Sequence, residues 1–516
     1  MADSARPLNR VALVPAALLL ALVAVPLVAV ASRATGFALA PADWAAVRFS
    51  ILQALLSAIF STLLAIPVAR ALARRRFAGR RALITLMGAP FLLPAIVAVL
   101  GLLAVFGRSG MMNDFGAMVG LPQVSIYGLH GVVLAHVVLK MPLAVRMILQ
   151  GWQAIPTERF RLAASLGFGP AEVARHLERP MLRSVLPGAA LVIFVICLTS
   201  FAVVLTLGGG PRATTVELAI YQAVRFDFDL GRAALLALVQ FAICAAAAGL
   251  AWAVVRPAGF GAGLDRQMTL GAPPGWRRLV DAGVIGAAAL FLLVPLAAVI
   301  LRGVPGLFDL PTSVLGASLR SVAVAAISTC ITVSMALVMA VAVASRARGA
   351  AVIEAAAVVP LAASGLVLGT GLFLIVHPFA SPTSLALPVT VLVNTALSLP
   401  YVYRLLLPEA RALAADYGRL ADSLGLQGFA RWRWLVLPRL ARPLGFGAGI
   451  AAALSMGDLG VIALFAGESQ ATLPLLVQQL MGSYRMEAAA AAALLLVALS
   501  FALFWICDWG GRRAAA

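Results

Sequence analysis

Charged residues are scarce in this 516-residue chain: they make up 11% of it, whereas hydrophobic residues make up 63%. Soluble domains contain roughly 25% charged and 45–50% apolar residues. This chain therefore has too few polar side chains to cover a water-soluble particle of its size, which excludes a soluble enzyme, a disordered chain and a secreted disulfide scaffold. With a mean hydropathy of +1.02, the sequence predicts an all-α polytopic membrane protein.

Residues that usually bind metals or phosphates are also rare. The four cysteines lie in apolar runs without a CxxC or Cys/His spacing, and the four histidines are scattered. Lys140 is the single lysine, and it follows Val-Val-Leu instead of completing a Gly-x4-Gly-Lys-Ser/Thr phosphate loop. We therefore expect no metal site, no cofactor bound by this chain and no enzymatic activity of its own.

Twelve apolar stretches are long enough to cross the roughly 30 Å hydrocarbon core of a membrane. The first exceeds the about 7–15 apolar residues of a signal-peptide core, so we expect it to be retained although Ala29-Val30-Ala31 resembles a cleavage site. The twelve stretches are 11–31, 50–69, 83–106, 129–149, 186–206, 234–255, 279–301, 318–344, 351–376, 385–403, 444–466 and 487–507.

Basic residues outnumber acidic ones by 39 to 20. In a soluble protein such an excess points to nucleic acid, but here the arginines gather in the loops between apolar stretches. Most of them fall on one side of the membrane if the N-terminus is cytoplasmic, and the densest group, within 70–81, follows the second stretch. The positive-inside rule then places both termini in the cytoplasm, with anionic lipid and not nucleic acid beside these loops.

The second half of the chain repeats the first. Residues 158–180 and 416–438 are identical at nine of 23 aligned positions, at an offset of 258 residues, which is half the chain length. Nearer the start of each half the offset becomes 270 and pairs Gly101 with Gly371, so the first half carries about 12 extra residues in between. Because each copy has six stretches, an even number, both copies are expected to have the same orientation in the membrane.

Each copy contains a long inner loop that is predicted to form two short helices. Gly167 and Gly425 mark the break between them, because glycine adopts backbone conformations that alanine resists. Small residues such as Ala163 and Ala421 would let another surface approach closely. Arginines alternate with leucines in both loops so that one face of each helix is apolar, and these leucines are Leu162, Leu166, Leu177, Leu420, Leu424 and Leu435. Amphipathic helices outside the bilayer lie on the membrane or fit a partner's groove. The repetition favours a docking element that is used twice over a loop that merely packs on its own bundle.

The two loops resemble the EAA loop of ABC importer permeases: Glu-Ala-Ala, three residues, Gly, nine residues, and Ile-x-Leu-Pro. The glycine and the proline are present in both copies, while an arginine replaces the leading Glu of each. The Leu before the proline is kept as Leu437 but replaced by Arg179, so the second copy is the closer match. In that family the loop forms a coupling helix in a cleft of a separate ATPase. The resemblance implies these coupling residues: Glu158, Arg161, Leu162, Ala163, Gly167, Leu177 and Pro180, then Asp416, Arg419, Leu420, Ala421, Gly425, Leu435, Leu437 and Pro438.

Longer strings extend the resemblance to the fused permeases of bacterial thiamine ABC transporters. It implies a type I importer permease fold that carries thiamine and its phosphate esters across the inner membrane. It also implies two copies of an ATPase, which use ATP and magnesium, and a periplasmic thiamine-binding protein. A ferric-iron importer permease and an ion-coupled secondary transporter are the alternatives. The strings are Val47–Ser50, Ala71–Arg80, Tyr127–Gly131 and above all Ser200–Val224.

The repeat and the resemblance together divide the chain into four segments. Two segments are permease modules, and each follows a segment that carries one additional membrane helix. The segments are 1–45 (N-terminal helix and periplasmic loop), 46–254 (module 1), 255–313 (linker with the seventh membrane helix) and 314–508 (module 2).

Ionisable groups inside apolar stretches are candidates for the transport pathway. Asp458 is the clearest, and its repeat partner is Ser200. A carboxylate would suit the thiazolium cation of thiamine, whereas a hydrogen bond to a neighbouring helix is the alternative role. Glu354 and Lys140 are expected near the ends of their stretches, with side chains extended toward the membrane surface.

Overall fold

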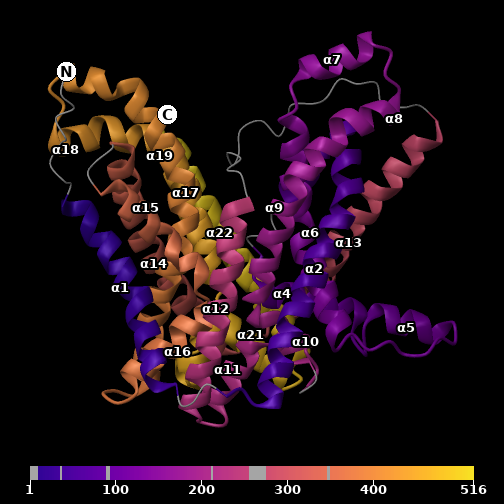
Figure 1. The fold of residues 1–516 in the computed structure, drawn as a ribbon. Coiled ribbons are helices and arrows are strands. Elements are labelled where there is room, and N and C mark those ends of the chain that lie inside the picture. The colour runs from indigo at the N-terminus through magenta and orange to yellow at the C-terminus, as the bar shows by residue number, and fades with distance from the viewer. Residues whose placement is uncertain are drawn as a thin grey trace. The chain divides into compact units, whose positions relative to one another are not determined.

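The structure, a computed structural model, is helical and has no strand in the part of the chain that it describes (Figure 1). That part is residues 10–34, 38–88, 93–210, 213–254, 275–345 and 349–515. The chain forms two compact units, and each unit is discontinuous in sequence. Unit 1 comprises 1–39, 216–245 and 305–516, and unit 2 comprises 40–215 and 246–304.

The helices confirm the predicted membrane class. Among the described residues, 11 helices are long and apolar enough to cross a membrane, and a pair bent by 94° brings the total to 12 if it is one span. Each of the predicted stretches overlaps one of these helices. They are Ala12–Arg33, Pro41–Arg74, Ala95–Met118, Leu129–Gln153, Pro170–Leu198, Leu230–Ala251, Trp276–Gly306, Thr312–Ala344, Pro382–Ser423, Gly428–Phe465 and Met486–Ala515, with the bent pair Ala350–Ala362 and Gly365–Val376.

Unit 2 is organised around three long helices, α2, α6 and α9, which pack against one another. Its elements are α2 (Pro41–Arg74), α3 (Arg80–Leu86), α4 (Ala95–Phe106), α5 (Met111–Met118), α6 (Leu129–Gln153), α7 (Thr157–Ser165), α8 (Pro170–Val173), the π-helical turn η2 (Ala174–Glu178), α9 (Arg179–Leu198), α10 (Phe201–Leu207) and most of α13 (Trp276–Gly306).

Unit 1 repeats this arrangement with α14, α17 and α19, and α22 packs along α19. Its elements are α1 (Arg10–Arg33), α11 (Val216–Arg225), most of α12 (Leu230–Val254), α14 (Thr312–Ala344), α15 (Ala350–Val358), η4 (Val359–Ala362), α16 (Gly365–Val376), η5 (Pro382–Leu385), α17 (Ala386–Ser423), α18 (Gly428–Arg431), the π-helical turn η6 (Trp432–Val436), α19 (Leu437–Met456), α20 (Gly460–Phe465), η7 (Glu468–Gln470), α21 (Leu473–Gly482) and α22 (Met486–Ala515).

The helix that precedes each repeated module packs in the unit of the other module. In unit 2, Gly101 of α4 lies against α13, where a Cβ at Gly101 would be 2.5 Å from the carbonyl oxygen of Pro295. In unit 1, Gly371 of α16 meets Pro26 of α1 in the same way. Glycine permits this close helix crossing because it has no side chain. The compact units therefore do not follow the contiguous segments predicted from the repeat.

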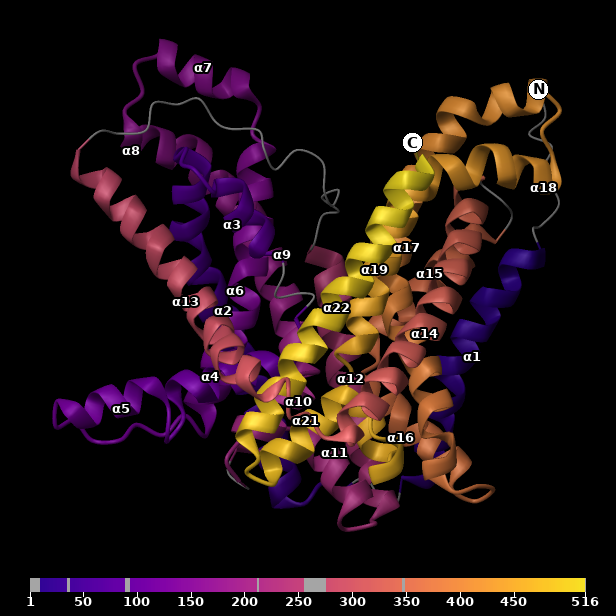
Figure 2. The same cartoon turned by 180° about the vertical axis from the view of Figure 1, so that it is seen from behind.

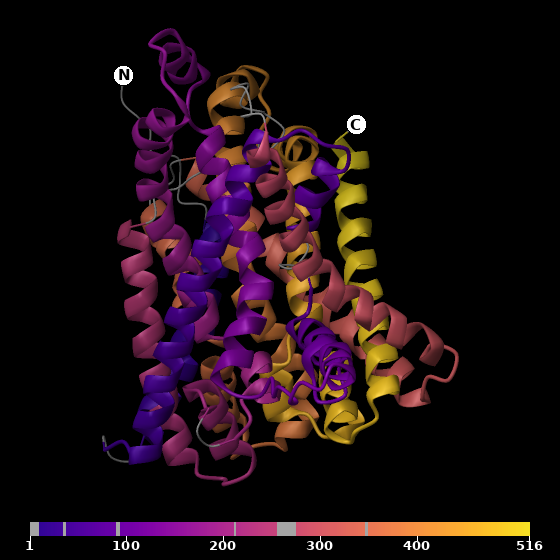
Figure 3. The same cartoon turned by 90° about the vertical axis from the view of Figure 1, so that its right-hand side faces the viewer.

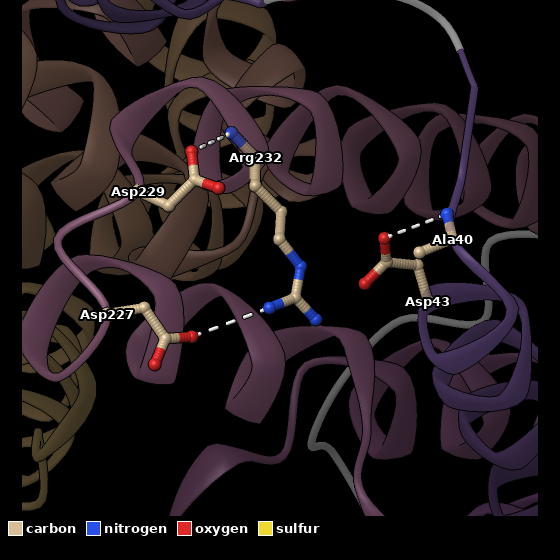
Figure 4. A network of polar contacts seen from close by, with 5 residues as sticks. All are labelled: Ala40, Asp43, Asp227, Asp229 and Arg232. Atoms are coloured by element: carbon tan, nitrogen blue, oxygen red, sulfur yellow. Dashed lines mark hydrogen bonds and ion pairs between the residues drawn. The ribbon is translucent and has the colours of Figure 1, made fainter.

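Aspartates begin one long helix in each unit. In unit 1, Asp229 Oδ1 accepts a 2.9 Å hydrogen bond from the backbone N–H of Arg232 at the start of α12, and Arg232 Nη1 lies 3.4 Å from Asp227 Oδ2 (Figure 4). In unit 2, Asp43 Oδ2 accepts a 3.1 Å bond from the N–H of Ala40 at the start of α2. These carboxylates satisfy N–H groups that have no partner within the helix.

Candidate functional site

The first candidate coupling loop, residues 158–180, is built from α7, α8 and η2. The chain reverses direction after α7 at Gly167, whose φ is +72°. The Gly167 N–H donates to Ala164 O at 3.1 Å and the Phe168 N–H donates to Ala163 O at 2.9 Å. This pair of hydrogen bonds is a Schellman cap, which requires a left-handed residue at its centre. The predicted glycine break is confirmed.

The second candidate coupling loop, residues 416–438, ends its first helix in the same way. Gly425 has a φ of +66°, its N–H donates to Asp422 O at 3.2 Å, and the Leu426 N–H donates to Ala421 O at 2.9 Å. The approach to the turn differs between the loops. Here α17 runs unbroken from the membrane span to Ser423, whereas α6 and α7 are separate helices.

A wide π-helical turn precedes the proline of each loop, η2 before Pro180 and η6 before Pro438. At the end of η2 the Arg179 N–H donates to Ala174 O, five residues back instead of four. Proline has no N–H, and in a regular helix its ring collides with the carbonyl four residues earlier. The wide turn relieves that collision, so each proline has a structural role at the entry to α9 or α19.

Each loop exposes two leucines that are four residues apart. Leu162 and Leu166 are 60% and 62% exposed, and Leu420 and Leu424 are 54% and 66% exposed. Residues at this spacing lie on one face of a helix, so each pair forms a small apolar ridge. Such a ridge fits an apolar groove on a partner protein. The sequence placed Leu166 and Leu424 on the apolar face of these helices but did not count them among the coupling residues.

The alanines of the motif face the inside of the loops. Ala163 is 3% exposed and Ala421 is 2% exposed. Ala163 packs with Phe160 and Val173, which belong to the two arms of the first loop. The small size of Ala163 thus lets these arms approach each other. The surface that approaches Ala163 closely is therefore the second arm of its own loop.

Buried ion pairs attach the first loop to the end of α2. Glu178 Oε2 lies 2.8 Å from Arg70 Nη2, and Glu178 Oε1 lies 2.5 Å from Arg74 Nη2. Only 4% of the Glu178 side chain is exposed, so both guanidinium groups are needed to compensate a charge removed from water. The repeat places the apolar Val436 at the equivalent position of the second loop.

Exposed polar contacts hold the second loop instead. Arg431 Nη1 lies 2.9 Å from Asp422 Oδ1 across the Gly425 turn, and the guanidinium of Arg439 lies 4.6 Å from the ring centre of Tyr417. Such surface pairs contribute little each and are screened by salt. The two loops share a backbone design but are held by different forces.

The other predicted coupling residues lie on the surface or at its edge, and nothing in the structure tests their role in coupling. The exposed ones are Glu158, Arg161, Pro180, Asp416, Arg419, Leu437 and Pro438, and the half-buried ones are Leu177 and Leu435.

The arginine group after the second span makes specific contacts in addition to any role in orientation. Arg75 Nε lies 2.6 Å from Asp281 Oδ2 of α13, and the buried Arg80 donates from Nε to Leu72 O at 2.9 Å. The Arg75 pair joins the end of α2 to α13, the pairs to Glu178 join it to the first loop, and Arg80 joins it to the start of α3. The sequence could not show the contacts with Glu178 and Asp281, because these partners lie more than 100 residues away along the chain.

The predicted pathway residues both stand where a helix is interrupted. Ser200 lies between α9 and α10, and Asp458 lies between α19 and α20. The Asp458 carboxylate faces the backbone N–H groups at the start of α20, those of Gly460, Val461 and Ile462. Its Oδ2 is buried and makes no hydrogen bond with the described residues.

Sequence reasoning missed a buried polar cluster in unit 2. Ser57 Oγ of α2 lies 3.1 Å from His136 Nδ1 of α6, and Gln53 Nε2 donates to the carbonyl of Cys197 in α9 at 3.0 Å. Lys140 is also on α6, near the middle of the helix. The expectation that Lys140 lies near the end of its span is therefore wrong.

Unit 1 has a neutral counterpart of this cluster. Asn394 Nδ2 and Ser328 Oγ both donate to Ser455 Oγ, at 2.9 and 3.0 Å. The 258-residue offset relates Asn394 to His136 and Ser455 to Cys197. Interhelical hydrogen bonds of this kind fix the packing of membrane helices, and a position-by-position comparison of the two halves would have identified both clusters.

Comparison with known proteins finds close likeness along nearly the whole chain. The thiamine transport system permease protein ThiP of Brucella abortus (strain 2308) is 40% identical over 483 residues, covering 92% of this chain and 88% of that protein. The permease of the same name from Salmonella typhimurium is 40% identical over 490 residues (91% and 90%), and that from Escherichia coli K12 is 39% identical over 483 residues (90% and 88%).

The chain belongs to the thiamine transport system permease family. No model in the family scan matches it, so this membership depends on the likeness to individual relatives. Members of this family are permease subunits of ABC transporters, so the chain is a transport subunit and not a catalytic one. An ATPase and a binding protein are the general partners of such a permease. The family resemblance stated from the sequence is confirmed.

Proposed function

We propose that this chain is the membrane-spanning subunit of an ABC importer that moves thiamine and its phosphate esters across the bacterial inner membrane. The observation that carries the proposal is identity of about 40% to thiamine permeases over about nine-tenths of the chain. The duplicated loops support it, because two exposed leucine ridges offer two equivalent docking sites to an ATPase that works as a pair.

The partners follow from this arrangement. Two copies of a cytoplasmic ATPase, which bind ATP and magnesium, would each receive one loop, and a periplasmic thiamine-binding protein would deliver the vitamin. The permease itself would bind no cofactor. The arginine bias supports cytoplasmic termini, since both loops then lie on the cytoplasmic side.

Uptake of labelled thiamine tests the substrate. We expect a strain that lacks this gene to lose high-affinity thiamine uptake and to regain it from a plasmid copy. Unlabelled thiamine phosphate should compete with the label. Loss of ferric-iron uptake with normal thiamine uptake would contradict the proposal in favour of an iron importer. Uptake that survives ATP depletion but stops when the proton gradient collapses would indicate a secondary transporter.

Asp458 is proposed as a pathway residue because its buried Oδ2 has no partner among the described residues and thiamine carries a fixed positive charge. We expect Asp458→Asn to keep the yield of folded permease and to lower thiamine uptake. ATPase stimulation by the loaded binding protein should persist, because the coupling loops are unchanged. Full uptake by Asp458→Asn, combined with loss of folded protein in Asp458→Leu, would show that Asp458 only supports the start of α20.

A further inference from the structure

The segment that distinguishes the two repeats in length is an apolar hairpin in unit 2. It comprises α5 and the irregular segment that leads back to Gly128, and we call it the α5 hairpin (residues 107–128). It lies within the region where the first half is longer by about 12 residues. α5 runs crosswise to α13 and projects away from it (Figure 2), so that the view turned by 90° looks nearly along its axis (Figure 3).

Polar contacts close the base of the hairpin. The side chain of Asn113 is buried, and its Nδ2 donates to Gly107 O at 2.8 Å and to Val124 O at 3.0 Å. Its Oδ1 accepts from the Val124 N–H at 2.9 Å. Arg302, at the end of α13, donates to Ser109 O at 3.2 Å. The base of the hairpin is therefore closed by its own hydrogen bonds and is attached to α13.

The hairpin exposes a contiguous apolar surface of the kind that soluble proteins rarely leave in contact with water. Seven of its large apolar side chains are more than half exposed, and its only charged residues are Arg108 at the base and Asp114. The seven are Met111, Met112, Phe115, Met118, Val119, Leu121 and Val124.

Two observations identify what covers this surface. α4 and α5 together form one stretch apolar enough to cross a membrane, Ala95–Met118. The Arg302 contact also places the hairpin base beside the apolar face of α13, another candidate span, on which Leu301 is 70% exposed. The hairpin surface thus continues an exposed apolar face of a helix that is long and apolar enough to cross a membrane. The nearly uncharged composition argues against a soluble protein partner, whose docking surface would carry a polar rim.

We propose that the α5 hairpin is a membrane-embedded anchor of the first module, with its seven apolar side chains in contact with lipid acyl chains. A helix that lies in the interface plane buries its apolar face at the boundary between headgroups and acyl chains. The hairpin holds α4 and α13 together at its base and secures them to the bilayer. This role does not depend on which substrate is transported.

Site-directed spin labelling of the full chain in liposomes tests the anchor. The accessible cysteines, Cys330 and Cys507, are first replaced by serine. A nitroxide is then attached to Met112→Cys or Met118→Cys in vesicles of phosphatidylethanolamine and phosphatidylglycerol. Collisions with oxygen report lipid, and collisions with a water-soluble nickel chelate report water. Leu301→Cys is the lipid-facing reference, and Gln123→Cys is the polar reference on the same hairpin.

We expect the oxygen-to-nickel accessibility ratio at 112 and 118 to match that at 301 and to exceed that at 123 several-fold. A ratio at both positions as low as that at 123 would overturn the proposal. Immobilisation of either label only when the periplasmic binding protein is added would also overturn it, since it would identify the hairpin as a protein-docking surface. Both labelled positions are exposed and lie outside the Asn113 contacts, so labelling leaves the hairpin closed.

Discussion

Replacing Glu178 by alanine is expected to destabilise the first coupling loop by about 3 kcal/mol, because two guanidinium groups then face each other beside a buried site with no counter-charge. Arg70 is 39% exposed and Arg74 is 18% exposed, so water relieves part of the cost and the value lies at the low end for a broken buried pair. Amide hydrogen exchange in η2 and the first turn of α9 should accelerate by about 100-fold. Less ATPase should co-purify with the permease.

The second loop supplies the control for this prediction. It has Val436 in place of Glu178, and α14 has no basic residue in its last turn. The triple variant Arg70→Ala, Arg74→Ala and Glu178→Val copies that apolar arrangement. It should restore exchange protection to within about threefold of the parent, as apolar replacements of buried ion pairs do. Unchanged exchange in Glu178→Ala would show that the ion pairs do not hold the loop.

Replacing Gly425 by glutamate is expected to release the ATPase while the permease still inserts and folds. A non-glycine residue at a φ of +66° costs about 1–2 kcal/mol. A Cβ at this position would meet no atom within 4 Å, so the cost comes from the backbone and not from a clash. We expect co-purified ATPase and thiamine uptake each to fall roughly tenfold. Gly425→Asn is the matched control, because asparagine tolerates the left-handed region, and it should retain most activity.

The same change at Gly167 should do less damage. The φ of Gly167 is similar, at +72°, but the first loop is also held by the Phe160 cluster and by Glu178. The second loop matches the coupling motif more closely, and the Arg431–Asp422 ion pair across its turn is exposed. Normal ATPase yield and normal uptake in Gly425→Glu would refute the coupling role of this turn.

The glycine turns are the part of the candidate site that the sequence predicts best. Gly167 and Gly425 could be placed because a Schellman cap depends on a few consecutive residues, and the repeat doubled the signal. The sequence placed the four ridge leucines on the apolar face of the predicted helices, but only Leu162 and Leu420 were also counted among the coupling residues. The structure added that all four, including Leu166 and Leu424, are more than half exposed. The polar clusters around His136 and Asn394 were not predicted, because the members of each cluster come from three separate helices.

The sequence by itself determined the membrane class, the approximate position of the apolar spans, the repeat and the place of the two repeated loops. Each of these features depends on composition or on the spacing of residues that are near one another along the chain. Only the tertiary structure decided that α1 packs with the second module and α13 with the first, and that Glu178 attaches a loop to α2. Helices in lipid are all apolar on the outside, so hydropathy cannot choose their neighbours. The choice is made by close-fitting pairs such as Gly101 with Pro295 and by a few buried polar contacts.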